Sequence, residues 1–140
     1  MLEEHLRTGS ILKAMERSMH SARHCFTEYF YQAGKMKHVE YSLLDSWYQF
    51  LTHSESTGFD TEADMIFYLQ TEPEIAFERV KKRGRVEEDS LQMDFLSGLH
   101  RLHEDWLIHG NNTAQARVPS PMWVTSINSI IYKIYKTSTT

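Results

Sequence analysis

The sequence ADMIFYLQTEPEIAFERV, residues 63–80, indicates a buried strand that is followed at once by a helix. Residues 63–69 are apolar apart from one acid, and an unbroken apolar run of this length is typical of a strand covered on both faces, as in a parallel sheet. Pro73 suits the first turn of a helix, with Thr71 or Glu72 at its cap. We therefore predict a strand–helix unit of an α/β protein.

The rest of the chain alternates predicted strands and helices around this unit. We expect further strands at 11–15 and 122–124, helices at 21–33, 39–53 and 90–109, a short helical piece at 2–7, polar connections at 54–62 and 111–121, and a weakly patterned segment at 130–135. Helix 21–33 is the clearest of these, because Ser21 suits its N-cap, apolar side chains recur every three or four residues, and Gly34 suits its end. Strands that alternate with helices favour an α/β sheet.

Composition narrows the class of function. The chain has 140 residues, of which 41% are hydrophobic and 24% charged, as in an ordinary globular domain. Its formal net charge of −4 argues against nucleic-acid binding, and no apolar run approaches the roughly 18 residues of a membrane span. The single cysteine, Cys25, excludes a disulfide framework and a cysteine metal site.

A basic run is the first candidate functional feature. Residues 79–85 contain five cations, Arg79, Lys81, Lys82, Arg83 and Arg85, and three acids follow at 87–89. Guanidinium groups offer paired donors that suit phosphate oxygens. The alternative is a solvated helix end whose cations complement the helix dipole. Its position one helix beyond the predicted strand 63–69 favours ligand binding, because ligands of α/β sheets bind at the carboxyl ends of strands.

Two further features leave alternatives open. Glu16 and Arg17 directly follow the predicted strand 11–15, where an arginine can hold a phosphate or can simply form an ion pair with its neighbour. Phe26 can stack on a flat base, although an aromatic residue in a helical stripe is usually part of the core. The HxxHE spacing of residues 100–104 matches no zinc-protease motif, so these histidines are expected to be structural or at the surface. The sequence also lacks a GxxxxGK phosphate loop.

Several ordered segments together resemble one enzyme family. MERSMHSAR, CF, WYQFL, ADMIFYLQTEP, ERVKKRGRVEE and LHEDWLIH are similar to segments of the deoxynucleoside kinases, especially the thymidine kinase 2-like and insect-type enzymes. The resemblance covers residues 1–109, whereas residues 110–140 diverge from it. It implies a P-loop kinase fold, with a parallel sheet flanked by helices, and transfer of the ATP γ-phosphoryl group to the 5′-hydroxyl of a thymidine- or deoxycytidine-type nucleoside in nucleotide salvage.

The resemblance also implies a role for individual residues. It places Arg17 at the 5′-oxygen and the phosphoryl group, Glu16 near Mg²⁺, Phe26 stacked on the base, Ala22 beside a thymine-type ring, Glu88 on the sugar 3′-hydroxyl, and Arg79, Lys81, Arg83 and Arg85 in a lid over the ATP phosphates. Such a lid would neutralise charge and exclude water, which are the main requirements of phosphoryl transfer.

The resemblance does not extend to the N-terminal third of the family's sequence, which holds the phosphate loop. We therefore expect an N-terminally truncated, partial kinase domain that is inactive and poorly soluble in isolation. The alternative is a non-catalytic copy that pairs with a full-length kinase. Family members pair through helices, so a homodimer or heterodimer is expected, with candidate contacts in the apolar stripes at 41–51 and 95–106. The implied compartment is mitochondrial or cytoplasmic, with no membrane or nucleic-acid partner.

Overall fold

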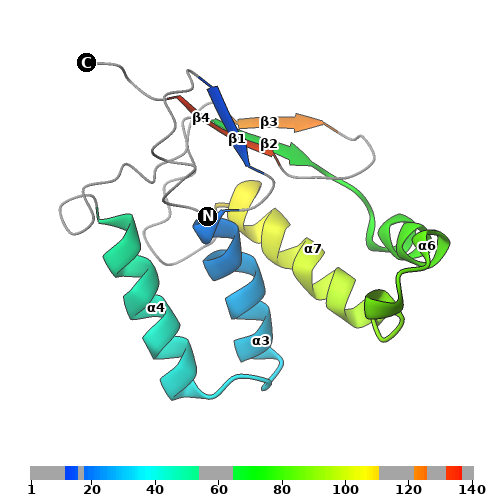
Figure 1. Ribbon diagram of the computed structural model, residues 1–140, viewed down its shortest axis with the longest axis horizontal. Helices are drawn as coiled ribbons and strands as arrows, with labels where there is room; N and C mark the ends of the chain where they lie inside the picture. The colour runs from blue at the N-terminus through cyan, green and yellow to red at the C-terminus, as the bar shows by residue number, and fades with distance from the viewer. Residues whose placement is uncertain (1–11, 16–17, 54–64, 111–121, 126–131, 137–140) are drawn as a thin grey trace.

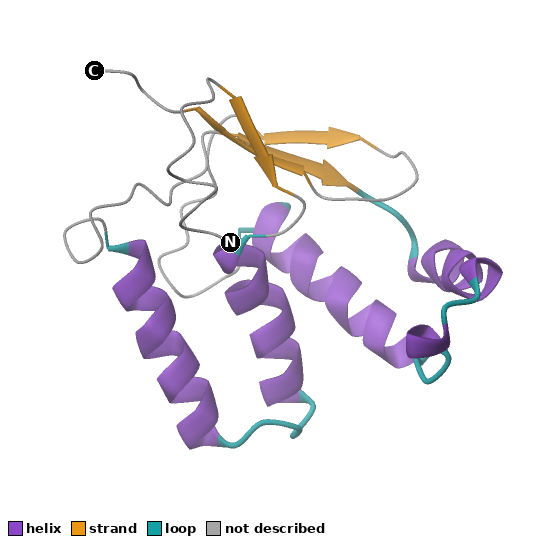
Figure 2. Cartoon of the chain, in the orientation of Figure 1, coloured by secondary structure: helices purple, strands orange, loops and turns teal. Residues whose placement is uncertain are grey.

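The computed structural model describes residues 12–15, 18–53, 65–110, 122–125 and 132–136. A sheet lies along one side of the molecule, and α3, α4 and α7 lie below it in Figure 1, with α6 beyond one end of the sheet (Figure 2 has the same view). The elements in chain order are β1 (Leu12–Met15), α2 (Met19–Ser21), the π-helical turn η1 (Ala22–Thr27), α3 (Glu28–Gln32), α4 (His38–Thr52), β2 (Met65–Leu69), α6 (Pro73–Arg83), the 3₁₀ turn η2 (Val86–Glu88), α7 (Met93–Leu107), β3 (Met122–Thr125) and β4 (Tyr132–Lys136).

The sheet combines parallel and antiparallel pairs in the strand order β1-β4-β2-β3. The pair β2–β3 is parallel, with Ile66 opposite Met122, and α6 and α7 lie on the long connection that a parallel pair requires. The strand β4 runs antiparallel to both β1 and β2. The parallel arrangement expected from the sequence is thus present between β2 and β3. The weakly patterned segment supplies β4, the antiparallel strand that lies between β1 and β2.

The strand–helix unit predicted at residues 63–80 is present. Ile66 and Tyr68 are buried on one face of β2, and Phe67 on the other face is half-buried. Glu72 is the N-cap of α6 in extended backbone and Pro73 is the first helical residue, as expected. The helix ends at Gly84, whose φ of +62° lies in the left-handed region that glycine adopts without steric cost.

The helix predicted at residues 21–33 begins three residues earlier than expected. Ser18 is the N-cap, because its hydroxyl accepts a hydrogen bond from the Ser21 amide while the Ser21 hydroxyl accepts one from the Ser18 amide. This reciprocal arrangement is a capping box, in which Ser21 occupies the third helical position. The helical segment then widens into η1 before α3, and it stops before Gly34. The prediction of Ser21 as N-cap was therefore wrong.

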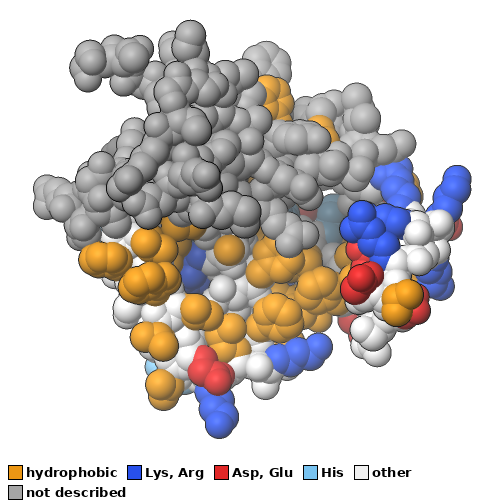
Figure 3. Space-filling model, viewed as in Figure 1, with side chains coloured by type: hydrophobic (Ala, Val, Ile, Leu, Met, Phe, Trp, Pro, Cys, Tyr) orange, Lys and Arg blue, Asp and Glu red, His pale blue; other side chains and the backbone are white. Residues whose placement is uncertain are grey.

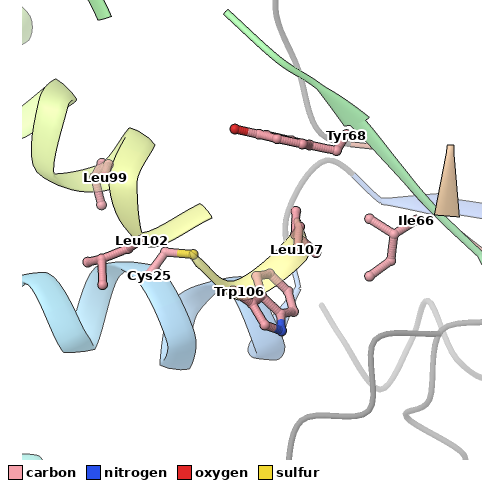
Figure 4. Close-up of a cluster of buried hydrophobic side chains, with 7 residues drawn as sticks. All are labelled: Cys25, Ile66, Tyr68, Leu99, Leu102, Trp106 and Leu107. Carbon is pink, nitrogen blue, oxygen red and sulfur yellow. The ribbon is translucent and has the colours of Figure 1, made fainter. Parts of the chain in front are cut away.

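Among the residues whose burial the structure describes, a core of seven buried side chains joins the sheet to the helices (Figure 4). Its members are Cys25 of η1, Ile66 and Tyr68 of β2, and Leu99, Leu102, Trp106 and Leu107 of α7. The apolar stripe predicted for helix 90–109 is confirmed, because Leu99, Leu102 and Trp106 all lie in this core. In α4, by contrast, Leu44 and Trp47 of the predicted stripe are exposed.

Some predictions lie outside the described residues, namely the helical piece at 2–7, the connections at 54–62 and 111–121, and the Glu16–Arg17 pair. Within the described ranges, no helix has both the length and the apolar character that a membrane span requires.

Candidate active site

A cavity of about 310 Å³ lies at the carboxyl end of β2, between α6 and α7. Its lining comprises Tyr68, Leu69 and Thr71 at the end of the strand, Pro73, Ala76, Arg79, Val80 and Arg83 of α6, and Leu96, His100 and His103 of α7. Most of the described lining is apolar, and the two arginines are the only described residues in it with a permanent charge. The cavity occupies the position in which α/β proteins usually bind ligands.

The four predicted lid cations, Arg79, Lys81, Arg83 and Arg85, do not act as one group. Arg79 and Arg83 are four residues apart on α6, so they share a face and both line the cavity. The Lys81 ammonium instead lies 4.3 Å from the centroid of the Phe77 ring, on the same helix. Arg85 follows the end of α6 and is exposed. The structure therefore brings two of the four cations together in the cavity.

Glu88, the predicted sugar-binding acid, is held by Arg83. The Arg83 Nη2 atom lies 2.7 Å from each carboxylate oxygen, and Nε lies 3.0 Å from Oε2. Arg85 makes a longer contact, with 3.8 Å between its Nη1 atom and Glu88 Oε1. Charge-assisted contacts of this two-pronged kind are among the stronger hydrogen bonds in proteins. Two residues expected to serve different substrates are thus bonded to each other.

The predicted base-binding residues both lie in the π-helical turn η1, a type of turn that is frequent at functional sites. Ala22 is exposed. Phe26 is partly buried and packs against the core, which agrees with the structural alternative that the sequence left open. Its ring meets the His103 ring edge-on, with the centroids 6.4 Å apart and an interplanar angle of 89°. Phe26 lines neither this cavity nor the second one described below.

His103 connects the Phe26 ring to the cavity. Its Nδ1 atom donates to the Leu99 carbonyl at 2.7 Å, and its ring lies parallel to that of Tyr68, with centroids 6.1 Å apart. The Tyr68 hydroxyl donates to Glu104 at 2.6 Å, and burial together with this carboxylate raises the pKa of Tyr68. His103 thus belongs to structural packing, whereas His100 of the same HxxHE segment lines the cavity. Among the described residues, no cluster of three or more possible metal ligands occurs.

A second cavity, of about 350 Å³, lies between the end of α3 and the beginning of α7. It is lined by Tyr29, Lys35, Ser90, Leu91, Gln92 and Phe95. Ser90 is only two residues beyond Glu88, so this cavity lies beside the turn that carries the predicted sugar-binding acid. Its lining is more polar than that of the first cavity, and Lys35 is the one cation among its described residues.

The profile of the deoxynucleoside kinase family matches residues 2–137. The chain belongs to the deoxynucleoside kinase family. Mitochondrial thymidine kinase 2 of Homo sapiens is 42% identical over 112 residues, which cover 79% of this chain and 41% of the relative. Deoxyguanosine kinase of Xenopus laevis mitochondria is 35% identical over 102 residues, covering 73% and 38%. Deoxycytidine kinase 2 of Gallus gallus is 35% identical over 92 residues, covering 66% and 34%. The chain thus spans about a third to two fifths of the length of these relatives.

Sequence reasoning missed a buried arginine in this kinase-family chain. Arg23 of η1 is 8% exposed, and its Nε atom lies 2.6 Å from Asp45 Oδ1 of α4. Its Nη2 atom donates to the Tyr41 hydroxyl at 2.7 Å, and that hydroxyl donates to Glu28 at 2.8 Å. Burial opposes the charge of Arg23, but the hydrogen bond to Asp45 raises its pKa overall. This network fixes the turn that carries Ala22 and Phe26 against α4.

Proposed function

We propose that the protein transfers the γ-phosphoryl group of ATP to the 5′-hydroxyl of a deoxynucleoside in nucleotide salvage. Membership of the deoxynucleoside kinase family supports this activity, and relatives named thymidine and deoxycytidine kinases favour a pyrimidine nucleoside. The observation that carries the proposal is the placement of Arg79 and Arg83 in a cavity at the carboxyl end of β2. The names of two relatives favour a mitochondrial or cytoplasmic location.

The donors around the first cavity fit an anionic phosphate chain. Two guanidinium groups supply paired N–H donors of the geometry that phosphate oxygens accept. Among the described side chains, the hydroxyl of Thr71 is buried without a hydrogen-bond partner, and Thr71 lines the same cavity. ATP would supply the phosphoryl group, while Arg79 and Arg83 would bind and orient its phosphates.

The deoxynucleoside side of the proposal rests on η1 and η2. Glu88 would accept a hydrogen bond from the sugar 3′-hydroxyl, and Phe26 and Ala22 would border the base. Arg17 at the 5′-oxygen and Glu16 near Mg²⁺ remain proposals from the resemblance, since both lie outside the described residues. The described part of the chain offers no metal-ligand cluster, so we assign no further residue to Mg²⁺.

The proposal is tested by comparing two cation variants of α6 in the protein as isolated from its natural source, because this chain in isolation is expected to be inactive. Arg79→Gln removes a cation that lines the cavity, whereas Lys82→Gln removes one that is exposed and does not line it. A hydrogen bond between charged groups contributes about 1.5–3 kcal/mol, so Arg79→Gln is expected to lower kcat/KM for ATP about 10- to 100-fold. Lys82→Gln is expected to change it by less than about twofold. Equal effects, or no ATP-dependent formation of thymidine or deoxycytidine monophosphate, would contradict the proposal.

We also propose that α4 forms part of a homodimer interface. Large apolar side chains remain exposed along it, with Val39 at 77%, Leu43 at 69%, Trp47 at 58% and Phe50 at 48% (Figure 3 shows apolar side chains gathered over this region). Trp47 and Phe50 stack on each other, with centroids 5.6 Å apart, which makes a flat apolar surface. Exposed patches of this kind mark interaction sites.

The pairing proposal predicts that a charge on this face separates the subunits. Leu43→Glu is expected to convert a dimer of the intact protein into a monomer in sedimentation analysis, whereas Glu40→Gln on the same helix should leave the mass unchanged. A monomeric wild-type protein would refute it. A heterodimer with a second kinase chain is the alternative outcome, and it would be seen as co-purification of a larger kinase that Leu43→Glu abolishes.

A further inference from the structure

Arg83 and Glu88 form an ion pair with each other. The Arg83 side chain is 48% exposed and that of Glu88 is 20% exposed, so solvent and ligands can reach the pair. The Nε and Nη2 atoms of Arg83 face the carboxylate, which accepts three contacts from this one residue. Arg85 is a minor partner, because its contact is 3.8 Å long.

The pair joins the two proposed substrate sites. Arg83 lines the cavity proposed for the ATP phosphates, whereas Glu88 is proposed to hold the nucleoside sugar. While Glu88 is paired with Arg83, its carboxylate offsets the positive charge that a phosphate would bind. The phosphate would also lie close to the negative charge of Glu88, which is within hydrogen-bond distance of Arg83. Two anions that share one guanidinium group repel each other. The pair therefore opposes phosphate binding at Arg83.

We propose that the Arg83–Glu88 pair is a latch that couples nucleoside binding to phosphate binding. This inference rests on the proposed function. A sugar hydroxyl that donates to Glu88 competes with Arg83 for the carboxylate oxygens, and this competition loosens the ion pair. Arg83 then becomes available to the ATP phosphates. Because coupling between two ligands is reciprocal, phosphate binding at Arg83 equally releases Glu88 for the sugar.

The size of the coupling follows from the exposure of the pair. Measured ion pairs at protein surfaces are weak, and the partial burial of Glu88 and the double contact place this one toward the upper end of their range. We expect the latch to weaken nucleotide binding about two- to fivefold, which corresponds to about 0.4–1 kcal/mol at 1.4 kcal/mol per tenfold. Coupling of this size is sufficient to favour binding of nucleotide after nucleoside.

The chain offers a matched control for the test. Glu87 precedes Glu88 in the same turn, carries the same charge and is exposed. Glu87→Gln and Glu88→Gln therefore change the net charge equally and at almost the same place. Any general electrostatic gain in anion binding is common to both variants, and only the excess seen with Glu88→Gln reports the latch.

The experiment measures binding of a non-hydrolysable ATP analogue to the intact protein by calorimetry, with and without thymidine. Without thymidine, Glu88→Gln is expected to bind the analogue two- to fivefold more tightly than Glu87→Gln. In the wild type, saturating thymidine should give a similar gain, which Glu88→Gln should abolish. In the Arg83→Gln background, the difference between the two glutamate variants should disappear.

Two failures of this experiment are distinguishable. If the analogue binds but Glu88→Gln and Glu87→Gln have equal affinities, the latch is refuted and the proposed function stands. If the analogue binds to no form of the protein, the proposed function fails and the latch fails with it. A difference between the glutamate variants that persists in the Arg83→Gln background also refutes the latch, because it cannot arise from this ion pair.

Discussion

The contact between Gly98 and Tyr29 allows a prediction whose sign depends on two opposing energies. Gly98 lies within α7, where a glycine is normally unfavourable, and the Tyr29 ring lies directly over it. A Cβ atom at residue 98 would be 2.6 Å from Tyr29 Cδ2 and closer still to Cε2. The ring is also held edge-on against Phe95, with centroids 5.0 Å apart. Gly98 thus lets α3 approach α7 closely.

The magnitudes decide the expected effect of Gly98→Ala. Replacing glycine by alanine in a helix stabilises it by about 1 kcal/mol. Forcing an extra carbon into a packed contact costs about 1–3 kcal/mol. We therefore expect Gly98→Ala to lower the free energy of unfolding by about 1 kcal/mol. In a Tyr29→Ala background, where the side chain ends at Cβ, both overlapping ring atoms are absent and the same substitution should stabilise the protein by up to about 1 kcal/mol.

Urea unfolding of the intact protein, followed by circular dichroism, measures all four forms. The reversal of sign between the two backgrounds is the decisive result, because helix propensity is the same in both. A gain of about 1 kcal/mol from Gly98→Ala with Tyr29 present would refute the reasoning, since the ring would then move aside without cost. Tyr29 also lines the second cavity, so a displaced ring should alter that site too.

Three further predictions concern the polar clusters. Arg23→Met should lower the free energy of unfolding by about 2–4 kcal/mol. This loss is smaller than that expected for a fully buried ion pair, because the Asp45 side chain is 30% exposed. A loss below about 1 kcal/mol in urea unfolding would contradict the prediction. Burial alone would raise the pKa of Glu28, but its hydrogen bonds and the charge of Arg23 lower this pKa below the ordinary 4.5. The ionised Glu28 therefore stabilises the fold above about pH 4.5, and this stabilisation is lost as the pH falls through the pKa of the folded state. Acid titration should therefore destabilise Glu28→Gln less steeply than the wild type, and parallel curves would count against the assignment. Tyr68→Phe should cost about 1–2 kcal/mol, because it removes a donor to Glu104, and an unchanged urea midpoint would show that the bond contributes nothing.

The features that could be predicted from the sequence are those with a local cause. An apolar run followed by Pro73 defines a strand and a helix start within ten residues, and both are found. Helix α7 is similar, because the spacing of Leu99, Leu102 and Trp106 alone indicates the face that packs against the core. The beginning of helix 21–33 was misplaced because Ser18 and Ser21 both suit an N-cap. The backbone distinguishes them, because Ser18 is extended whereas Ser21 is already helical.

The features that were missed depend on partners distant in the sequence. Arg23 and His24 are buried although their side chains are polar, because Asp45 and Tyr48 of α4 supply hydrogen bonds to them. A helical apolar stripe contains no information about such partners. The strand β4 is paired with β1 more than a hundred residues earlier, and its sequence YKIYK has no clean alternation. The π-helical turn η1 likewise has no recognised sequence signal.

The charged residues of the candidate site also form contacts that the sequence pattern alone did not predict. The basic run was predicted to form one lid, but in the structure its side chains point to different surroundings. The contact between Arg83 and Glu88 depends on Gly84. If α6 continued unbroken, a residue five positions on would lie about 7.5 Å further along the axis and about 140° around it. A two-pronged contact would then be out of reach. Because Gly84 adopts a left-handed conformation and ends the helix, the chain turns and returns Glu88 to the arginine. The glycine that interrupts the basic run is therefore the residue that determines which of its cations is paired with Glu88.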